Sequence, residues 1–246
     1  MYDFAGMTSA LRAFRELQPQ EGAYISDISW SITGDSYLCA TSYSQPQLIS
    51  RDGAPKLKFI KGDQYVMDLT HTKGHVAAVV SCRWHPTDRA TCMTSSVDGS
   101  VRLWDIHTAD KSQKTVIRPR CERGTKVSVS CATYLPNASI AAICHDGSLQ
   151  LWGSNGPYHR PEAVVRLAHQ PASTLVATSK TAGLKVPEAG TCVAASPDSN
   201  MLLTRGTDHT LKVWDVRRLG TAVATHDNLH NHYSTGACMF SPDGSL

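Results

Sequence analysis

The 246-residue sequence lacks long apolar runs and paired metal-binding cysteines. Its longest apolar stretch, Val76 to Val80, is far shorter than the ~20 residues that span a bilayer, so we expect no membrane segment. None of the eight cysteines belongs to a Cys-x-x-Cys pair, which argues against zinc ribbons and thioredoxin-like redox sites. Without a signal-peptide pattern or a small disulfide framework, the sequence favours a reducing cytosolic or nuclear environment.

Charge of either sign is also modest. Charged residues make up 18% of the chain and the formal net charge is +3, which does not indicate attraction of the whole protein to nucleic acid. A glycine-rich phosphate loop is missing, and we expect no cofactor. Hydrophobic residues at 41% are typical of a globular protein with a core.

What the sequence does contain is an internal repeat. In three segments an aspartate precedes a tryptophan by six positions: Asp98 and Trp104, Asp146 and Trp152, Asp208 and Trp214. Between the two residues, Val or Leu alternates with polar residues, which is the period-two pattern of a strand. Asp-Gly before two of these strands predicts a tight hairpin.

A second element, an aromatic or small residue before a turn, lies about twenty residues upstream of each tryptophan. Its five copies start at positions 30, 84, 134, 195 and 240. Their spacings of 54, 50, 61 and 45 residues fit the ~40–45 residues of a four-stranded propeller blade with loop insertions. The sequence therefore predicts an all-β fold, a WD-type β-propeller of four-stranded antiparallel blades with about four and a half blades present. The predicted blades are 25–60, 75–118, 126–168 and 190–225, with the start of a fifth at 234–246.

Two segments lie outside the predicted blades. Residues 1–22 are predicted as an N-terminal segment with a short helix, in which Leu11, Phe14 and Leu17 follow Thr8 and Ser9 as N-cap candidates. Residues 171–187 are rich in Ser, Thr, Ala and Lys, which indicates a flexible loop insertion or, equally, an unspliced stretch.

The second copy resembles the WD-repeat family, whose blades hold a hydrogen-bonded tetrad of histidine, serine or threonine, aspartate and tryptophan. The resemblance implies that His75, Thr94, Asp98 and Trp104 form such a network. The fourth copy offers Thr204, Asp208 and Trp214, and the third keeps only Asp146 and Trp152, with Ala142 in place of the hydroxyl. We expect the histidine in the second copy alone.

A Thr-His-Asp set also suggests hydrolase chemistry. A motif repeated along the chain cannot be several active sites at once, so we expect a structural network and no enzyme. The first copy is the most degenerate, with Ile49 and Ser50 in place of Trp-Asp.

Beyond the generic repeat, the chain is similar to the WD repeat-containing protein 70 (gastrulation-defective protein) family. The residues that carry this resemblance are Asp3 to Met7, Leu11 to Phe14, Asp52-Gly53, Ile60 to Tyr65, Thr72 to His75 and Trp84 to Pro86. It implies a nuclear scaffold linked to cullin-4 ubiquitin ligases, chromatin and DNA repair, and some members accompany splicing machinery. The chain differs from the family in lacking a long polar N-terminal region, in ending inside a blade, and in extra residues between His169 and Cys192.

The main candidate for partner binding is Trp214-Asp215-Val216-Arg217, which resembles the box by which WD-repeat receptors dock onto the damaged-DNA-binding adaptor of cullin-4 ligases. The resemblance assigns the contact to Arg217, next to Asp215, and a planar guanidinium suits a protein interface. The alternative is an ordinary blade end with a solvated Arg217. Within the box, Arg205 departs from the preference for small residues.

Two further clusters have weaker functional interpretations. A basic run could bind nucleic acid or an acidic tail, although a solvated loop is the favoured interpretation; its residues are Lys111, Lys114, Arg118, Arg120, Arg123 and Lys126. His226, His230 and His232 gather near Asp227, but we expect no metal there.

The repeat predicts a non-enzymatic protein-interaction scaffold. The two resemblances further imply a nuclear substrate-receptor-like subunit of a cullin-4 ligase that acts in the chromatin and DNA-damage response. The alternative is a structural subunit of an RNA-processing (splicing) complex. We expect protein partners such as the ligase adaptor and chromatin or nuclear complex subunits, and neither direct nucleic-acid binding nor a membrane.

Overall fold

The computed structural model describes residues 9, 12–13, 15–66, 68, 71–121, 124–170, 189–231 and 236–243. The described strands form four four-stranded antiparallel sheets. Blade one holds β1 (Ile25–Trp30), β2 (Ser36–Thr41), β3 (Gln47–Ser50) and β4 (Pro55–Lys58). Blade two holds β5 (Val79–Trp84), β6 (Thr91–Ser96), β7 (Ser100–Asp105) and β8 (Thr115–Ile117). Blade three holds β9 (Val129–Tyr134), β10 (Ile140–Cys144), β11 (Leu149–Trp152) and β12 (Ala163–Val165). Blade four holds β13 (Gly190–Ala195), β14 (Met201–Gly206), β15 (Leu211–Asp215) and β16 (Ala224–His226), with the 3-10 helix η2 (Val216–Arg218) after β15.

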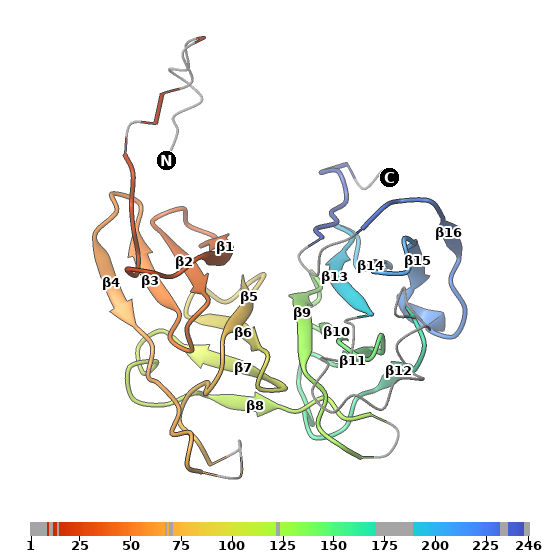
Figure 1. Ribbon diagram of the computed structural model, residues 1–246, viewed down its shortest axis with the longest axis horizontal. Helices are drawn as coiled ribbons and strands as arrows, with labels where there is room; N and C mark the ends of the chain where they lie inside the picture. The colour runs from red at the N-terminus through yellow and green to blue at the C-terminus, as the bar shows by residue number, and fades with distance from the viewer. Residues whose placement is uncertain are drawn as a thin grey trace, which may run out of the picture.

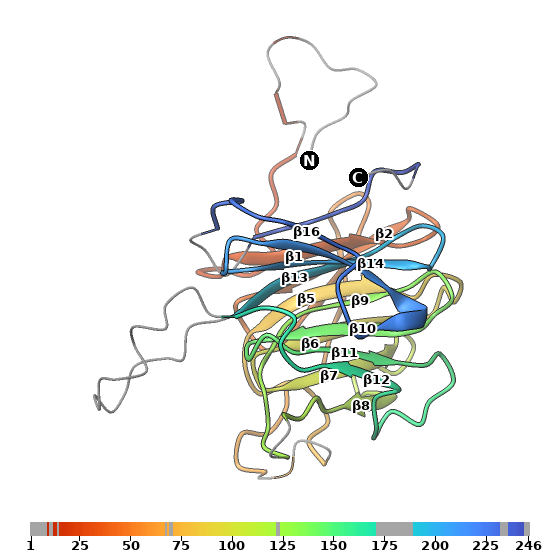
Figure 2. The same cartoon turned by 90° about the vertical axis from the view of Figure 1, so that its right-hand side faces the viewer.

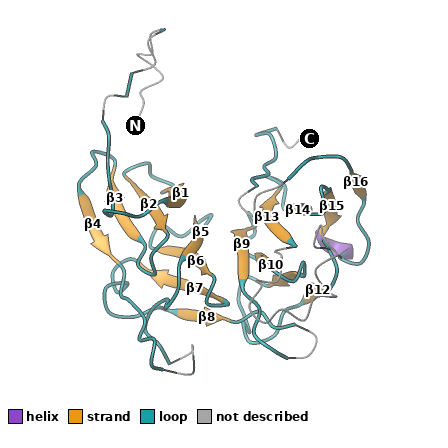
Figure 3. Ribbon diagram, in the orientation of Figure 1, coloured by secondary structure: helices purple, strands orange, loops and turns teal. Residues whose placement is uncertain are grey.

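Each sheet is a meander in which strands neighbouring in sequence are paired, and the four sheets follow one another along an arc (Figure 1). The first strand of every blade, β1, β5, β9 or β13, lies on the inner side of this arc, and β5 contacts both β1 and β9. In the side view of Figure 2 the strands of the four sheets run across the molecule in a broadly common direction. Strands and loops make up almost all of the described chain, as Figure 3 shows. The prediction of an all-β protein built from propeller-type blades is confirmed.

The hairpin between the second and third strands has a left-handed residue in blades two to four. Gly99 and Gly147 take φ values of 78° and 80°, and His209 takes 61° at the matching place in blade four. A Cβ at Gly147 would come within 2.0 Å of the His169 carbonyl oxygen, so glycine is required there by space as well as by conformation. These turns fix the register that places each tryptophan opposite the second strand.

The hydrophobic core lies between the blades. Blades one and two share a cluster that includes Leu38, Phe59 and Trp104, and similar clusters join blade two to three and blade three to four. On its other face, blade one exposes Ile28 and Trp30 by 47% and 50%. Tyr37, Cys39 and Ile49 of blade one are nevertheless buried in a separate cluster, against which Leu17 of the N-terminal segment packs.

The ends of the chain differ in part from expectation. Residues 236–243 lie against blade four, where Cys238 packs on its core cluster. The sequence predicts the start of a fifth blade at 234–246, but Cys238 to Phe240 do not form a strand. Of the predicted helix, Thr8, Leu11 and Phe14 lie outside the described residues, and so does the insertion 171–187. Within the described part of the chain, no helix has the length and apolar character needed to cross a membrane.

Candidate functional site

A buried network of four side chains ties blade two together. The Trp104 Nε1 donates to Thr94 Oγ1 at 2.7 Å, and Thr94 Oγ1 lies 2.8 Å from His75 Nε2. On the other side of the ring, His75 Nδ1 lies 2.9 Å from Asp98 Oδ2. Because an indole N–H can only donate, the Thr94 hydroxyl accepts from Trp104 and donates to His75, which leaves the His75 proton on Nδ1, facing Asp98. Every polar atom of the network then has a partner.

The charge states in blade two follow from this geometry. Burial lowers the pKa of His75, and the nearby Asp98 carboxylate offsets only part of this effect. Burial by itself would raise the pKa of Asp98, but His75, Ser100 and Arg102 favour the carboxylate and bring the pKa well below its usual value. The network therefore holds a neutral imidazole beside an ionised carboxylate.

Blade four contains a second complete tetrad, and the expectation of a histidine in blade two alone is wrong. His169 Nε2 lies 2.8 Å from Thr204 Oγ1, and His169 Nδ1 lies 3.0 Å from Asp208 Oδ1. Trp214 Nε1 donates to Thr204 Oγ1 at 2.8 Å, as in blade two. The sequence obscured His169 because it stands 39 residues before its aspartate, whereas His75 stands 23 residues before Asp98.

The third blade is less completely bonded. Asp146 accepts from the Ser148 backbone N at 2.9 Å and from the Ser148 hydroxyl at 2.7 Å. Trp152 is buried opposite Ile140, and Ala142 offers no hydroxyl to its indole. Asp146 thus stabilises its own turn, without a histidine among the residues that the structure describes.

Arg102, on β7, is a buried residue that the sequence pattern did not single out. Its Nη1 donates to the Thr72 carbonyl oxygen at 2.8 Å and its Nη2 to the Thr72 hydroxyl at 2.7 Å. Burial lowers the pKa of Arg102 to about 10, although Asp98 opposes this shift. At the matching place, Gln150 donates to the Arg120 carbonyl oxygen and Lys212 to that of Ala168. The alternation of apolar and polar residues along a strand does not reveal that these polar side chains are covered. In the structure, the loop that packs over each strand covers them.

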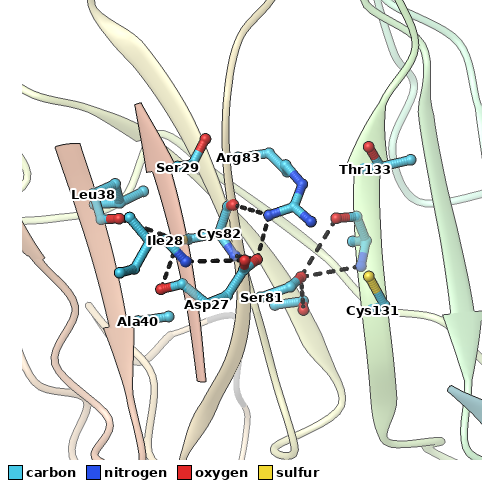
Figure 4. Close-up of polar contacts among 12 residues, drawn as sticks. Asp27, Ile28, Ser29, Leu38, Ala40, Ser81, Cys82, Arg83, Cys131 and Thr133 are labelled. Carbon is cyan, nitrogen blue, oxygen red and sulfur yellow. Dashed lines mark hydrogen bonds and ion pairs between the residues drawn. The ribbon is translucent and has the colours of Figure 1, made fainter. Parts of the chain in front are cut away.

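The inner strands are joined by polar contacts between blades, drawn in Figure 4. Asp27 on β1 accepts from the Cys82 backbone N at 3.0 Å and forms an ion pair with Arg83 on β5. Burial alone would lower the pKa of Arg83, but Asp27 raises it overall, so the guanidinium stays charged. Ser81 continues the pattern by accepting from the Ala132 backbone N of β9 at 3.1 Å.

The same contact recurs along the arc. Three positions before its last residue, each inner strand carries a side chain that reaches the part of the chain that follows along the arc. These residues are Asp27, Ser81, Cys131 and Cys192. Cys131 Sγ approaches the Val193 carbonyl oxygen at 3.9 Å, and Cys192 Sγ approaches that of Cys238 at the same distance. The contacts weaken from a carboxylate to thiols along the chain.

Arg217 lies at the end of blade four, on η2. The Asp215 side chain accepts from the Arg217 backbone N at 2.8 Å and so caps this short helix. The Arg217 side chain is exposed, and it makes no ion pair within the described ranges. Arg205 lies instead on β14, where it donates to the His230 and Ala237 carbonyl oxygens at 3.2 and 3.3 Å and ties down the chain after blade four.

The residues of the basic run lie on both sides of β8. Lys111 and Lys114 precede β8, whereas Arg118 and Arg120 follow it, about 10 Å away along a three-residue strand. Arg118 forms an ion pair with Asp68. An isolated antiparallel β-bridge joins the backbones of Arg120 and Lys126. Arg123 lies outside the described residues.

The described histidines near the end of blade four do not form a metal-binding group. His230 stacks against His209 with ring centroids 5.6 Å apart, His226 and Asp227 are exposed, and His232 lies outside the described residues. Among the described side chains, no three His, Cys, Asp or Glu residues are placed to hold a metal ion.

Comparison with protein families finds the WD domain, G-beta repeat, at residues 67–105 and 181–215. The first stretch contains the whole tetrad of blade two, and the second contains Thr204, Asp208 and Trp214 of blade four but not His169. WD repeat-containing protein 70 of Xenopus tropicalis is 39% identical over 246 residues, which is 100% of this chain and 37% of that protein. The gastrulation defective protein 1 homolog of Drosophila melanogaster is 37% identical over the same length, covering 35% of that protein. WD repeat-containing protein 70 of Homo sapiens is 41% identical over 169 residues, which is 68% of this chain and 26% of that protein. The chain thus spans little more than a third of the length of the Xenopus and Drosophila relatives.

Proposed function

The chain belongs to the WD-repeat proteins and is homologous along its whole length to WD repeat-containing protein 70, and from this we propose a nuclear, non-enzymatic scaffold that docks onto a cullin-4 ubiquitin ligase. WD-repeat proteins are generally non-enzymatic platforms for binding other proteins. In the proposed complex the chain is a substrate-receptor-like subunit that acts in chromatin and the DNA-damage response. The docking contact is Arg217, which binds the damaged-DNA-binding adaptor.

The exposure and fixed backbone of Arg217 are the observation that supports this proposal. The Asp215 cap holds η2 in place, and the tetrad at Trp214 braces the strand that leads into it. An exposed guanidinium on a rigid support loses little conformational entropy on binding and presents its donors in a fixed fork. Central arginines of this kind carry a large share of the binding energy in protein interfaces.

Co-purification with the adaptor tests the proposal in the full-length protein. Arg217→Ala should lose the adaptor, and Arg217→Lys should lose it as well if the contact is bidentate. The matched control is Arg218→Ala, which removes the neighbouring exposed guanidinium and should keep the adaptor. Because Arg217 lies outside the tetrad, Arg217→Ala should change the free energy of unfolding, measured by urea denaturation, by no more than ~0.5 kcal/mol.

The result that would overturn the proposal is equal adaptor recovery from the parent protein and Arg217→Ala. Nuclease treatment separates the RNA-associated alternative, because recovery of partners through RNA would be lost on digestion.

A further inference from the structure

Blade four departs from the other copies at the residue that ends its inner strand. Trp30, Trp84 and Tyr134 occupy this position in blades one to three, and Phe240 occupies it in the fifth copy of the sequence motif. Blade four has Ala195. The register confirms the equivalence, because Trp84, Tyr134 and Ala195 each pair with the residue of the second strand that faces the blade tryptophan.

The aromatic side chains at this position pack against the preceding blade. Trp84 reaches blade one, where its Nε1 donates to the Ser29 carbonyl oxygen at 3.0 Å. Tyr134 reaches blade two and contacts His85 edge to face, with ring centroids 5.0 Å apart. Ala195 cannot reach blade three in this way, so the seam between blades three and four loses the volume of one aromatic ring.

A cavity of about 240 Å³ opens at this seam. We name it the blade-four pocket, and its walls include Arg83, Trp84, Tyr134, Pro136, Ala195 and Pro197. The rings of Trp84 and Tyr134 and the prolines of the strand-end turns make these walls mostly apolar. Its size falls below the ~300–1,000 Å³ of a typical small-molecule site and suits a single large side chain.

One edge of the blade-four pocket is charged. Arg83 uses its Nη1 for Asp27 and for the Cys82 carbonyl oxygen. Its Nε and Nη2 have no hydrogen-bond partner among the described residues, and Figure 4 shows the guanidinium between β5 and β9, on the same side of these strands as Thr133. Nε and Nη2 together form the edge of a guanidinium that binds a carboxylate through two parallel hydrogen bonds.

We propose that the blade-four pocket receives an aromatic side chain of a partner peptide, and that Arg83 binds a carboxylate of an adjacent Asp or Glu in the same peptide. The ring replaces the one that Ala195 omits and packs between Tyr134, Pro136 and Pro197. An aromatic anchor in a preformed apolar pocket is the usual centre of a peptide-binding surface. This surface is independent of Arg217, and its test does not depend on adaptor docking.

A library of random dodecapeptides displayed on yeast, sorted against the full-length protein, tests the proposal. Enriched peptides should share an aromatic residue next to an Asp or Glu, and Ala195→Trp should not bind them. This variant restores the residue found at Trp84, so it should fold with a urea midpoint at or above that of the parent. Ala195→Leu fills the pocket with less bulk and should weaken the same peptides if the tryptophan variant fails to fold.

Two controls test whether the aromatic ring binds in the pocket and whether the carboxylate contributes to binding. Thr87→Trp places the same bulk on an exposed turn residue outside the pocket walls and should leave binding unchanged. Changing the acidic residue of an enriched peptide to its amide should weaken binding about tenfold, the loss expected for one charge-assisted contact. No enrichment, enriched peptides without an aromatic residue, full binding to Ala195→Trp, or an amide peptide that binds equally well would each overturn the proposal.

Discussion

Replacing Asp98 with alanine should be among the most destabilising single changes in this protein. The Asp98 side chain is 1% exposed and accepts from four groups: His75 Nδ1 at 2.9 Å, the Val76 backbone N at 3.2 Å, and the Ser100 backbone N and hydroxyl at 2.9 and 2.6 Å. Asp98→Ala leaves these donors without their acceptor and leaves Arg102 without its nearby counter-charge. Removing one partner of such a buried charged network costs about 3–5 kcal/mol.

The other blades supply matched comparisons. Asp208 makes the same contacts with His169 and Thr210, but its side chain is 16% exposed, so water can replace part of what Asp208→Ala removes. We expect a loss of about 2–3 kcal/mol there. Asp146 accepts only from Ser148 among the described residues, and Asp146→Ala should cost about 1 kcal/mol. The predicted order of destabilisation is therefore Asp98, then Asp208, then Asp146.

Urea denaturation of the full-length protein, followed by tryptophan fluorescence, measures these differences. A common slope of the free energy of unfolding against urea in all variants would show that the midpoints report stability. Equal losses for Asp98→Ala and Asp146→Ala would refute the reasoning, because Asp98 accepts from a histidine and a further backbone N that Asp146 lacks among the described residues. A loss for Asp208→Ala above that of Asp98→Ala would show that exposure does not decide the cost.

Two further predictions concern charge. Because burial lowers the pKa of His75 below 6.5 in the folded protein, the unfolded chain binds the extra proton, and stability should fall as the pH drops below about 6.5. The folded pKa of Asp208, about 2 against 3.8, adds stability that is present above pH 3.8 and is lost as the pH falls through about 2. Urea midpoints from pH 7.5 to 5 should decline less steeply in His75→Gln than in the parent, and parallel declines would contradict a neutral His75. For the contact between blades one and two, a double-mutant cycle with Asp27→Asn and Arg83→Gln should give a coupling of about 1 kcal/mol that shrinks in high salt, since both side chains are partly exposed. Additive effects at low salt would show that the pair does not couple the blades.

Local pattern was sufficient to find the blades and three members of each tetrad in blades two and four. The hydroxyl residue, the aspartate and the tryptophan all lie on one hairpin, so their spacing is the same in both blades: Thr94, Asp98 and Trp104, then Thr204, Asp208 and Trp214. A hairpin with a fixed turn has a fixed register, so the residues that face one another can be predicted from their spacing in the sequence. The aspartate and tryptophan of blade three follow the same rule.

The histidines depend on a different kind of connection. His75 and His169 lie on the loops between blades, 23 and 39 residues before their aspartates. Lengthening a loop adds only slowly to the entropy cost of closing it, so the fold tolerates both lengths and spacing cannot identify the second histidine. The sequence signal available in blade four was His169 itself, placed before an insertion that hid its equivalence to His75.

The sequence by itself determined the strands, the hairpin registers and the repeat, because these depend on side-chain alternation and on turns between residues close in the chain. Only the tertiary structure decided which blade faces which, and with it the contact of Asp27 with Arg83, 56 residues away, and the pocket beside Ala195. An alanine in a strand carries no signal of a cavity. The cavity exists because neighbouring blades place aromatic rings at the same level and blade four does not, and the packing of separate sheets is a property of the folded chain alone.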